Sequence, residues 1–495
     1  MPAPYLSLSQ VPTAYTANPS AFQEVLKKAG TQIVKIAVIG DSQETQYGGF
    51  GDPYIPALNQ QFAIRYGNAP CSTIGAGNYG GFSSGIGTDR AKWLKTARNA
   101  LSGGTALYPT SKVLPNMSVT AINSNANYQS GKLFALNDKM SSAFNLYHRW
   151  TNFFDSSQGV TLELILGTRP DAAPITIGTA YNANWSHSFT LTDRITNIDP
   201  GLVAAGSSLL KYLSPTITGP TSAQWLYTGT KLSAAGTKAV DLVDGRFYTA
   251  NPSKQYGVVV DNFGFGGYTA QQWYDAYLNT GEMLRTCGPY DMVVFHFGAN
   301  DSTGTSAAHE SALRLLIAYA RNAHQNQRLP IVICSDGYRQ HASTPIRDVY
   351  QTFPGIGMQL ASEYENVMVI NLQRMTDHLG YNDTSELETN YVDRGAWADA
   401  TSYSVNDRVT VTPFPLLPGY LFQFACIEAH TSATASIRPE TDRYWRPIKR
   451  YLTDGVHLNT QGADVAAQCF VNALYQGAFL ANNAQPGLPA LKRLL

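Results

Sequence analysis

Runs of consecutive apolar residues alternate with longer amphipathic stretches near the start of the chain and through its second half. The run at 33–39 stops abruptly at Gly40, which predicts a buried strand of a parallel sheet. After Gly267 the alternation is regular, with strands predicted at 291–297, 330–334 and 366–372, and helices at 270–284, 306–324, 346–364 and 460–480. Strands and helices in this alternation predict an α/β fold, with a parallel sheet covered by helices on both faces.

Two stretches interrupt this pattern. Between about 108 and 260, short apolar runs are separated by Gly, Pro, Ser and Thr, which predicts a β-sandwich or jelly roll with one internal helix at 136–150. The shorter stretch at 392–449 is rich in aromatic residues and is predicted to be all-β. We therefore expect an α/β domain in three parts (1–105, 257–391 and 450–495), an inserted β-rich domain (106–256) and a small β module (392–449).

Composition narrows the possible functions. The chain has 495 residues with 44% hydrophobic residues, so it can build real cores, and its 35 basic and 35 acidic residues give no net charge. A protein that binds a phosphate backbone or an anionic membrane surface needs a basic face, so both classes are disfavoured. With 29 Tyr, 20 Phe and 7 Trp and only 14% charged residues, the composition suits contact with neutral, hydroxyl-rich ligands.

The five cysteines are scattered and form no Cys-x-x-Cys pair, which predicts neither a disulfide framework nor a zinc site. We predict no cofactor and no metal. The first residues lack a basic segment followed by an apolar one, so we expect no secretory signal, and no apolar run reaches the length of a membrane span. The sequence leaves two locations open, the cytoplasm and a virion-associated site outside the cell.

Polar residues that could perform nucleophilic catalysis stand at both ends of the α/β pattern. Ser42 follows the first predicted strand directly, at the carboxyl edge where open α/β sheets bind ligands. Near the other end, Asp454 and His457 precede the last predicted helix. A serine needs a base to take its proton, and an Asp that accepts the Nδ1–H of a His fixes the tautomer that such a base requires. Taken alone, Ser42 is better explained by a turn that ends a strand, and Asp454 and His457 are equally well explained by a helix cap and a surface histidine.

Two further residues could stabilise an oxyanion. Gly267 follows the short predicted strand at 258–260, and a glycine lets a backbone N–H approach a substrate closely. Asn300 follows the strand at 291–297, so its side-chain amide is again placed at the carboxyl end of a strand. If the glycines stood alone, flexible turns would be the better explanation.

In this order and context, the four blocks around Ser42, Gly267, Asn300 and His457 resemble those of the SGNH hydrolases, also called GDSL-type esterases. The resemblance implies a three-layer α/β/α sandwich of flavodoxin-like type around a five-stranded parallel sheet. It also implies metal-free ester hydrolysis through an acyl-enzyme, with Ser42 as nucleophile, His457 as base and Asp454 as its partner. The implied oxyanion hole consists of the Ser42 N–H, the Gly267 N–H and the Asn300 side chain. Gln43 departs from the Leu that many relatives carry after the serine.

The long separation between Ser42 and Gly267 resembles that of carbohydrate O-acetylesterases with an intercalated β-domain. The stretch at 392–449 is similar to small chitin-binding-type modules, with Trp397, Tyr403 and Trp445 at the matching aromatic positions. Aromatic rings of this kind can stack on a sugar ring. A module of this size also needs aromatic residues for its own core, so both interpretations stay open.

Together these observations predict a serine esterase that removes O-acyl groups, most simply O-acetyl, from an acylated polysaccharide or glycan. Two alternatives remain: an acyltransferase on the same fold, and a phage tail or receptor-binding protein that attaches to bacterial surface glycan. We expect no nucleic-acid or membrane partner. The sequence does not decide between a monomer, a homo-oligomer and a virion tail assembly.

Overall fold

The computed structural model describes the parts of the chain that form the α/β core, the strands of the insert and most of the small module. These residues are 11–41, 43–44, 54–73, 135–136, 144–149, 155, 157–167, 175–181, 193–198, 209–214, 216, 225–232, 240–264, 267–277, 284, 287–335, 348–377, 391–411, 422–432, 444–447, 458 and 460–479.

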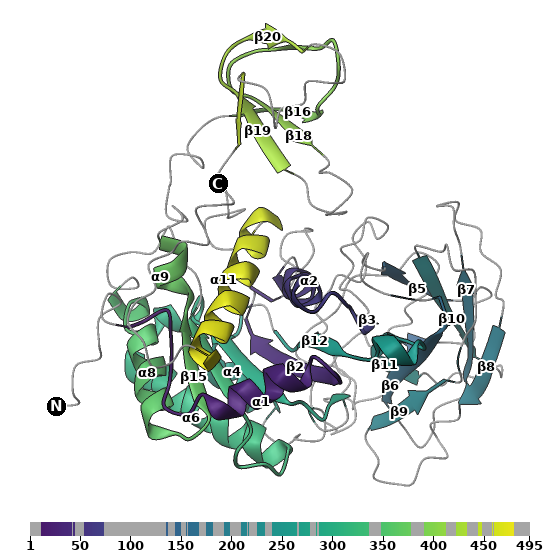
Figure 1. Cartoon of the computed structure of the whole chain (residues 1–495), viewed down its shortest axis with the longest axis vertical. Helices are drawn as coiled ribbons and strands as arrows, with labels where there is room; N and C mark the ends of the chain where they lie inside the picture. Colours follow the sequence, from purple (N-terminus) through teal and green to yellow (C-terminus); the bar gives the residue numbers. More distant parts are fainter. Residues whose placement is uncertain are drawn as a thin grey trace, which may run out of the picture.

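A six-stranded sheet forms the centre of the core (Figure 1). Its order is β1 (Ala14–Thr16), β15 (Val367–Asn371), β14 (Ile331–Ser335), β13 (Met292–Phe297), β2 (Ile33–Gly40) and β12 (Gly257–Asn262). The five strands from β15 to β12 are parallel, and β1 pairs with β15 in the antiparallel direction at the edge. The predicted parallel sheet is confirmed, and each predicted strand agrees with the observed one to within a residue or two at its ends.

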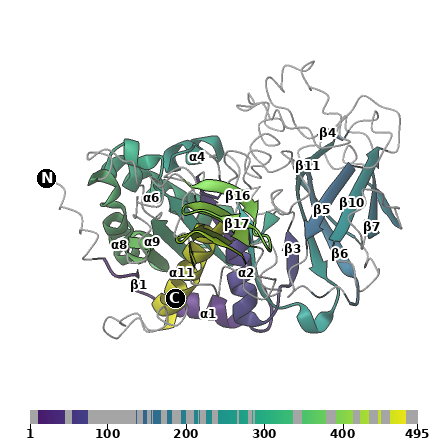
Figure 2. The ribbon, with the colours of Figure 1, turned by 90° about the horizontal axis from the view of Figure 1, so that it is seen from above.

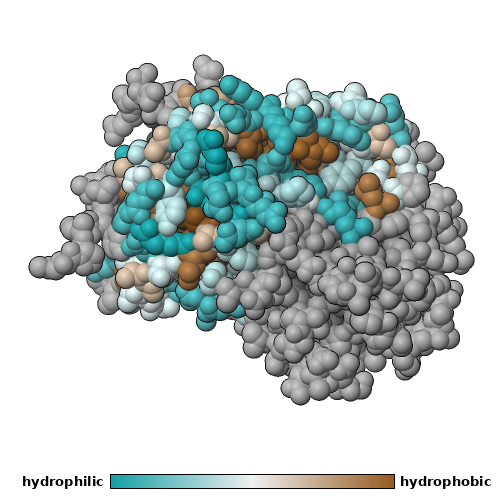
Figure 3. All heavy atoms as spheres, turned by 90° about the horizontal axis from the view of Figure 1, so that it is seen from below, coloured by the Kyte–Doolittle hydropathy of each residue, from teal (hydrophilic) through white to brown (hydrophobic). Residues whose placement is uncertain are grey.

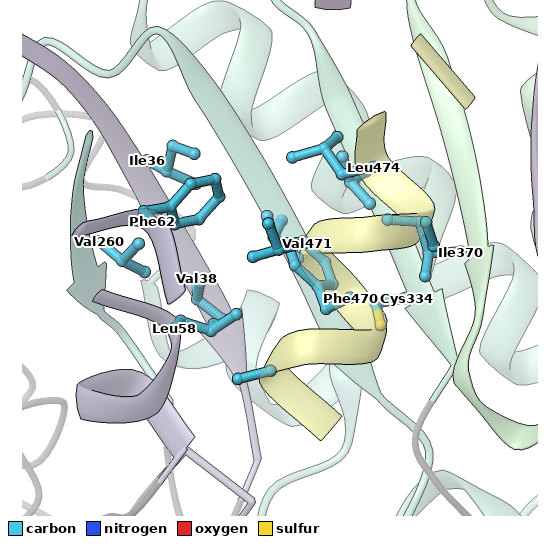
Figure 4. Packing of buried hydrophobic residues seen from close by; sticks show 14 of the residues in the cluster. Ile36, Val38, Leu58, Phe62, Val260, Cys334, Ile370, Phe470, Val471 and Leu474 are labelled. Carbon is cyan, nitrogen blue, oxygen red and sulfur yellow. The ribbon is translucent and has the colours of Figure 1, made fainter. Parts of the chain in front are cut away.

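Helices cover both faces of this sheet, as the sequence pattern predicts. One face packs against α1 (Ser20–Lys28), α2 (Tyr54–Tyr66) and α11 (Thr460–Phe479), and the other packs against α4 (Ala270–Tyr277), α6 (Ser306–Ala323) and α8 (Phe353–Glu363). Side chains alternate along each strand, so Val38 points to the first layer and Ile39 to the second. Figure 4 shows the first layer, where Phe470, Val471 and Leu474 of α11 lie over the sheet.

The strand order changes direction at the centre of the sheet. From β2 the chain continues on one side to β12 and then returns past β2 to β13 on the other side. This is the flavodoxin-like order, in which ligands bind outside the carboxyl ends of the two strands at the switch point. The short helix α9 (Leu372–Asp377) follows β15 at the same edge.

The chain between β2 and β12 forms two antiparallel sheets beside the core, which Figures 1 and 2 show at one side of it. One has the order β5 (Phe144–Arg149), β10 (Trp225–Leu232), β7 (Ile175–Tyr181) and β8 (Asp193–Ile198). The other has the order β3 (Cys71–Thr73), β11 (Val240–Thr249), β6 (Val160–Gly167) and β9 (Leu209–Leu213), and β4 (Ala135–Leu136) also pairs with β11. The strand β3 lies ahead of the predicted start of the insert at residue 106.

The helix predicted at 136–150 is wrong. Its described residues form β4 and β5 instead, and all six residues of β5 pair with β10. The segment contains no Gly or Pro and has apolar residues at helical spacing, so local propensity favours a helix. Pairing with a strand far along the chain overrides that preference.

The insert joins the core through a narrow connection and a buried charge network. At the connection, the Thr249 N–H donates to the Pro70 carbonyl oxygen over 3.1 Å. In the network, Arg246 of β11 is fully buried and contacts Glu163 of β6 at 2.9 Å and Asp261 of β12 at 2.7 Å. Tyr290 also donates to Asp261, over 2.6 Å. The insert is therefore tied directly to the edge strand of the core sheet.

The small module is all-β in its described residues, as predicted. Its sheet contains β16 (Val392–Ala396), β18 (Asp407–Val411), β19 (Phe422–Cys426) and β21 (Trp445–Pro447), and a second pair joins β17 (Ser402–Tyr403) to β20 (His430–Thr431). Figure 1 shows this module outside the three layers of the core.

The described surface in Figure 3 is mostly hydrophilic, with hydrophobic residues in small, separate groups. Among the helices that the structure describes, none has the length and apolar character needed to cross a membrane.

Candidate active site

The structure places two of the predicted site residues, and neighbours of Ser42 and of His457. Gly267 and Asn300 are described, whereas Ser42, Asp454 and His457 lie outside the described residues. The site is therefore built from the segments on either side of those three positions: Asp41 and Gln43 around Ser42, and the beginning of α11 after His457.

Three neighbouring strands bring the first three sequence blocks to one edge. In the sheet, β2 lies between β12 and β13, and all three run in the same direction. Near their carboxyl ends, Val38 is paired with Asn262 of β12, and Gly40 is paired with His296 of β13. The segments that carry Ser42, Gly267 and Asn300 therefore leave the sheet side by side, around its switch point.

The turn that follows β2 is held closely from within. Asp41 is fully buried, and its Oδ1 accepts the backbone N–H of Gln43 over 3.0 Å. This bond bridges the residue between them, which is Ser42. Gly40 permits close packing against β13, because a Cβ there would lie 2.6 Å from the His296 carbonyl oxygen, closer than real Cβ contacts allow.

Gly267 has a backbone conformation that suits glycine. Its φ is 80°, a left-handed value that costs other residues roughly 1–2 kcal/mol. A Cβ at this position would meet nothing within 4 Å, so the backbone conformation alone explains the glycine. The residue is exposed at the carboxyl edge, which leaves it open to a ligand from solvent.

Asn300 is fixed to the segment that carries Gly267. Its Nδ2 donates to the carbonyl oxygen of Tyr268 over 3.1 Å. Next to it, the carboxylate oxygens of Asp301 accept the N–H of Ala270 at 3.1 Å and 3.2 Å, where α4 begins. His309 contacts the same carboxylate at 3.0 Å through Nδ1. A primary amide has two N–H donors, and the bond to Tyr268 engages only one of them.

The start of α11 lies at the same edge as these segments. Helices α2 and α11 run side by side in the same direction, with Gln61 bonded to Asp464 over 2.9 Å and Tyr66 bonded to Tyr475 further along. Tyr54, the first residue of α2, lies against His296 with ring centroids 5.1 Å apart. Because α2 begins at the carboxyl edge, α11 begins there too. Leu458, the residue after His457, packs against the core cluster that includes residues of α2 and α11.

A buried pair that the sequence reasoning missed lies under the turn after β2. Glu44, two residues after Ser42, is fully buried and pairs with Nδ1 of His296, which is 2% exposed. A usable signal exists in the sequence, because His296 is a polar residue within the otherwise apolar strand β13. A buried polar side chain requires a partner, and Glu44 provides it.

The aromatic residues that the sequence proposes for glycan binding have mixed positions. Tyr403 is 3% exposed and Trp445 is 6% exposed, and both pack with Val409 and Phe424 in the module's core. Trp397 is partly buried and packs against this cluster. The rings of Tyr403 and Trp445 therefore serve the core, which is one of the two interpretations that the sequence leaves open.

No protein-family model matches this chain, and neither does any curated protein. Solved structures do match. A peptidoglycan O-acetylesterase aligns over 96% of this chain and 100% of its own, with 12% identity and a TM-score of 0.46. A salicylyl-acyltransferase from a tetracycline biosynthetic pathway aligns over 66% of this chain and 82% of its own, with 12% identity and a TM-score of 0.26. A carbohydrate acetylesterase from Xanthomonas citri aligns over 48% and 65%, with 10% identity and a TM-score of 0.21.

The observed core agrees with the fold implied by the four sequence blocks. It has five parallel strands between two helix layers, and three of the blocks start from adjacent strands at the switch point. In its sequence blocks and in its central sheet, the chain resembles the SGNH hydrolases.

Proposed function

We propose that this chain is a serine ester hydrolase that removes O-acyl groups, most simply O-acetyl, from a polysaccharide. The observation that supports the proposal is the side-by-side, parallel pairing of β12, β2 and β13, because the sequence segments with Gly267, Ser42 and Asn300 follow the carboxyl ends of these three strands. The beginning of α11 lies at the same edge, and Asp454 and His457 precede this helix in the sequence by a few residues.

In the proposed mechanism, His457 takes the proton of Ser42 while the serine oxygen attacks the acyl carbonyl carbon. The N–H groups of Ser42 and Gly267 and the amide of Asn300 stabilise the resulting oxyanion. His457 returns the proton to the sugar oxygen as the sugar–acyl bond breaks, leaving an acyl-enzyme. Water then attacks that ester by the same route, and acetate and free Ser42 are released. Asp454 holds the imidazole in the required tautomer.

The test combines one substitution, followed by three measurements, with a fourth measurement on the unaltered protein. In Ser42→Ala, we expect loss of p-nitrophenyl acetate hydrolysis and of covalent labelling by a fluorophosphonate, with an unchanged thermal melt. The unaltered protein should release acetate from at least one polysaccharide in a panel of acetylated bacterial polysaccharides. Retained hydrolysis or labelling in Ser42→Ala would rule out this nucleophile. Appearance of the acyl group on a second sugar, in place of free acetate, would identify an acyltransferase.

A further inference from the structure

The turn after β2 contains a buried side-chain bond that the mechanism above does not use. Glu44 folds back over Gly40 so closely that a Cβ on Gly40 would collide with its Oε2. The same carboxylate pairs with Nδ1 of His296. Both side chains are almost completely buried, at 0% and 2% exposure. A pair so deeply buried is held in one geometry by the packing around it.

The pair connects two elements that the proposed site must hold in register. Glu44 stands two residues after Ser42 in the sequence, and His296 belongs to β13, four residues before Asn300. His296 is also the residue of β13 that is paired with Gly40. The side-chain bond therefore crosses between the two strands at the switch point, at the level where β2 ends.

Other contacts fix the imidazole in place. The ring of Tyr54, which is 1% exposed, lies 5.1 Å from the His296 ring at an angle of 43°. On the other side of Ser42, the bond from Gln43 N–H to Asp41 closes the turn. In the sequence, Ser42 thus stands between Asp41, which accepts the N–H of Gln43, and Glu44, which pairs with the His296 side chain.

We infer that Glu44 and His296 are positioning residues, which set where Ser42 stands relative to the amide of Asn300. This inference rests on the proposed function and adds to it a pair that does not touch the substrate. A displacement of about 1 Å at a reacting group can lower a rate by about a hundredfold. Loss of the bond should therefore lower kcat strongly and change KM little.

Matched substitutions distinguish the effect of losing the hydrogen bond from the effect of changing the side-chain volume. An Asn side chain can place an N–H near the position of His Nδ1, whereas Leu cannot, so we expect His296→Asn to keep most of the activity and His296→Leu to lose it. Similarly, Glu44→Gln keeps an acceptor and Glu44→Ala does not. We expect kcat to fall about ten- to a hundredfold in His296→Leu and Glu44→Ala, with KM within about threefold. His324→Leu, at the end of α6, is the control and should keep full activity.

The measured quantity is kcat per active site, with the number of active sites determined by fluorophosphonate labelling. Unfolded molecules are not labelled, so a variant that is only partly folded does not show a reduced kcat. If His296→Leu and Glu44→Ala do not fold, the kcat of His296→Asn is compared with that of His296→Gln instead. Both are amides, but Gln extends its group past the Nδ1 position, so it should be the slower of the two. Equal kcat per labelled site in the compared variants would overturn the inference. The Ser42→Ala experiment tests a different claim, because retained activity in that variant would contradict the proposed function itself.

Discussion

Asn300 and Tyr268 are joined by a hydrogen bond of 3.1 Å from the Asn300 Nδ2 to the Tyr268 carbonyl oxygen. The bond connects two strands that are not neighbours in the sheet, because Tyr268 follows β12 and Asn300 follows β13, with β2 between them. It therefore links the segments on the two sides of β2, the strand that Ser42 follows in the sequence. The two proposed oxyanion donors, Gly267 and Asn300, are held to each other independently of the serine.

The position of Asn300 beside Tyr268 gives a prediction for Asn300→Ala. The substitution removes an amide donor, and loss of one oxyanion-hole donor typically lowers kcat about 10²- to 10³-fold. We expect that loss in p-nitrophenyl acetate hydrolysis, with labelling of Ser42 still detectable. Asn322→Ala, on the exposed side of α6, serves as the control and should retain activity. A kcat within twofold of the unaltered protein would remove Asn300 from the proposed oxyanion hole.

Gly267 can be compared with a second glycine of the same conformation. Gly395 in the small module has a φ of 73°, and a Cβ added at either glycine would meet nothing within 4 Å. Replacement by Ala should cost each position about 1–2 kcal/mol of backbone strain. Thermal melts should therefore shift by similar amounts, whereas only Gly267→Ala should lower kcat. Equal activities in the two variants would show that the Gly267 backbone takes no part in the reaction.

Arg246 should be essential for attachment of the insert. Its guanidinium is fully buried between Glu163 and Asp261, and removal of one partner from a buried charge network typically costs about 3–5 kcal/mol. We expect Arg246→Met to lower the denaturant midpoint markedly. Arg328→Met, which breaks an exposed 3.0 Å pair with Glu365, should cost about 1 kcal/mol or less. Comparable midpoints for the two variants would contradict this assignment.

The stability difference between the unaltered protein and Asp464→Asn should depend on pH. Burial raises the pKa of this carboxyl, and the hydrogen bond from Gln61 only partly offsets that effect. A folded pKa above the unfolded one means that stability is highest while the group is protonated and falls as pH rises through the folded value. Asp464→Asn stays neutral and can still accept from Gln61. Its stability advantage should therefore grow from acidic to neutral pH in urea titrations, and a constant difference would contradict the prediction.

The sequence predicts the central sheet well because its strands are buried on both faces. Unbroken apolar runs such as 33–39 identify strands of this kind without knowledge of their partners. The insert gives a weaker signal of short apolar runs, and within it the segment at 136–150 satisfies a helical pattern although its described residues pair as strands. Tyr403 and Trp445 show another limit, because aromatic side chains follow the same sequence pattern in a core and in a binding face.

The site was predictable only as far as strand ends could be identified. Gly267 and Asn300 follow predicted strands, and the sheet order then places them on either side of β2. The pair of Glu44 and His296 depends on the register between β2 and β13, which no local pattern encodes. Helix α2, which contributes Tyr54 to the same cluster, contains a proline and has no clear apolar stripe.

The narrow connection between Pro70 and Thr249 has a consequence for how this architecture can change over generations. Where a peripheral unit enters and leaves at hydrogen-bonded neighbours, it can be exchanged as a cassette without altering the scaffold that receives it. Arg246 limits that freedom here, since a replacement lacking an equivalent cation would leave Asp261 without it.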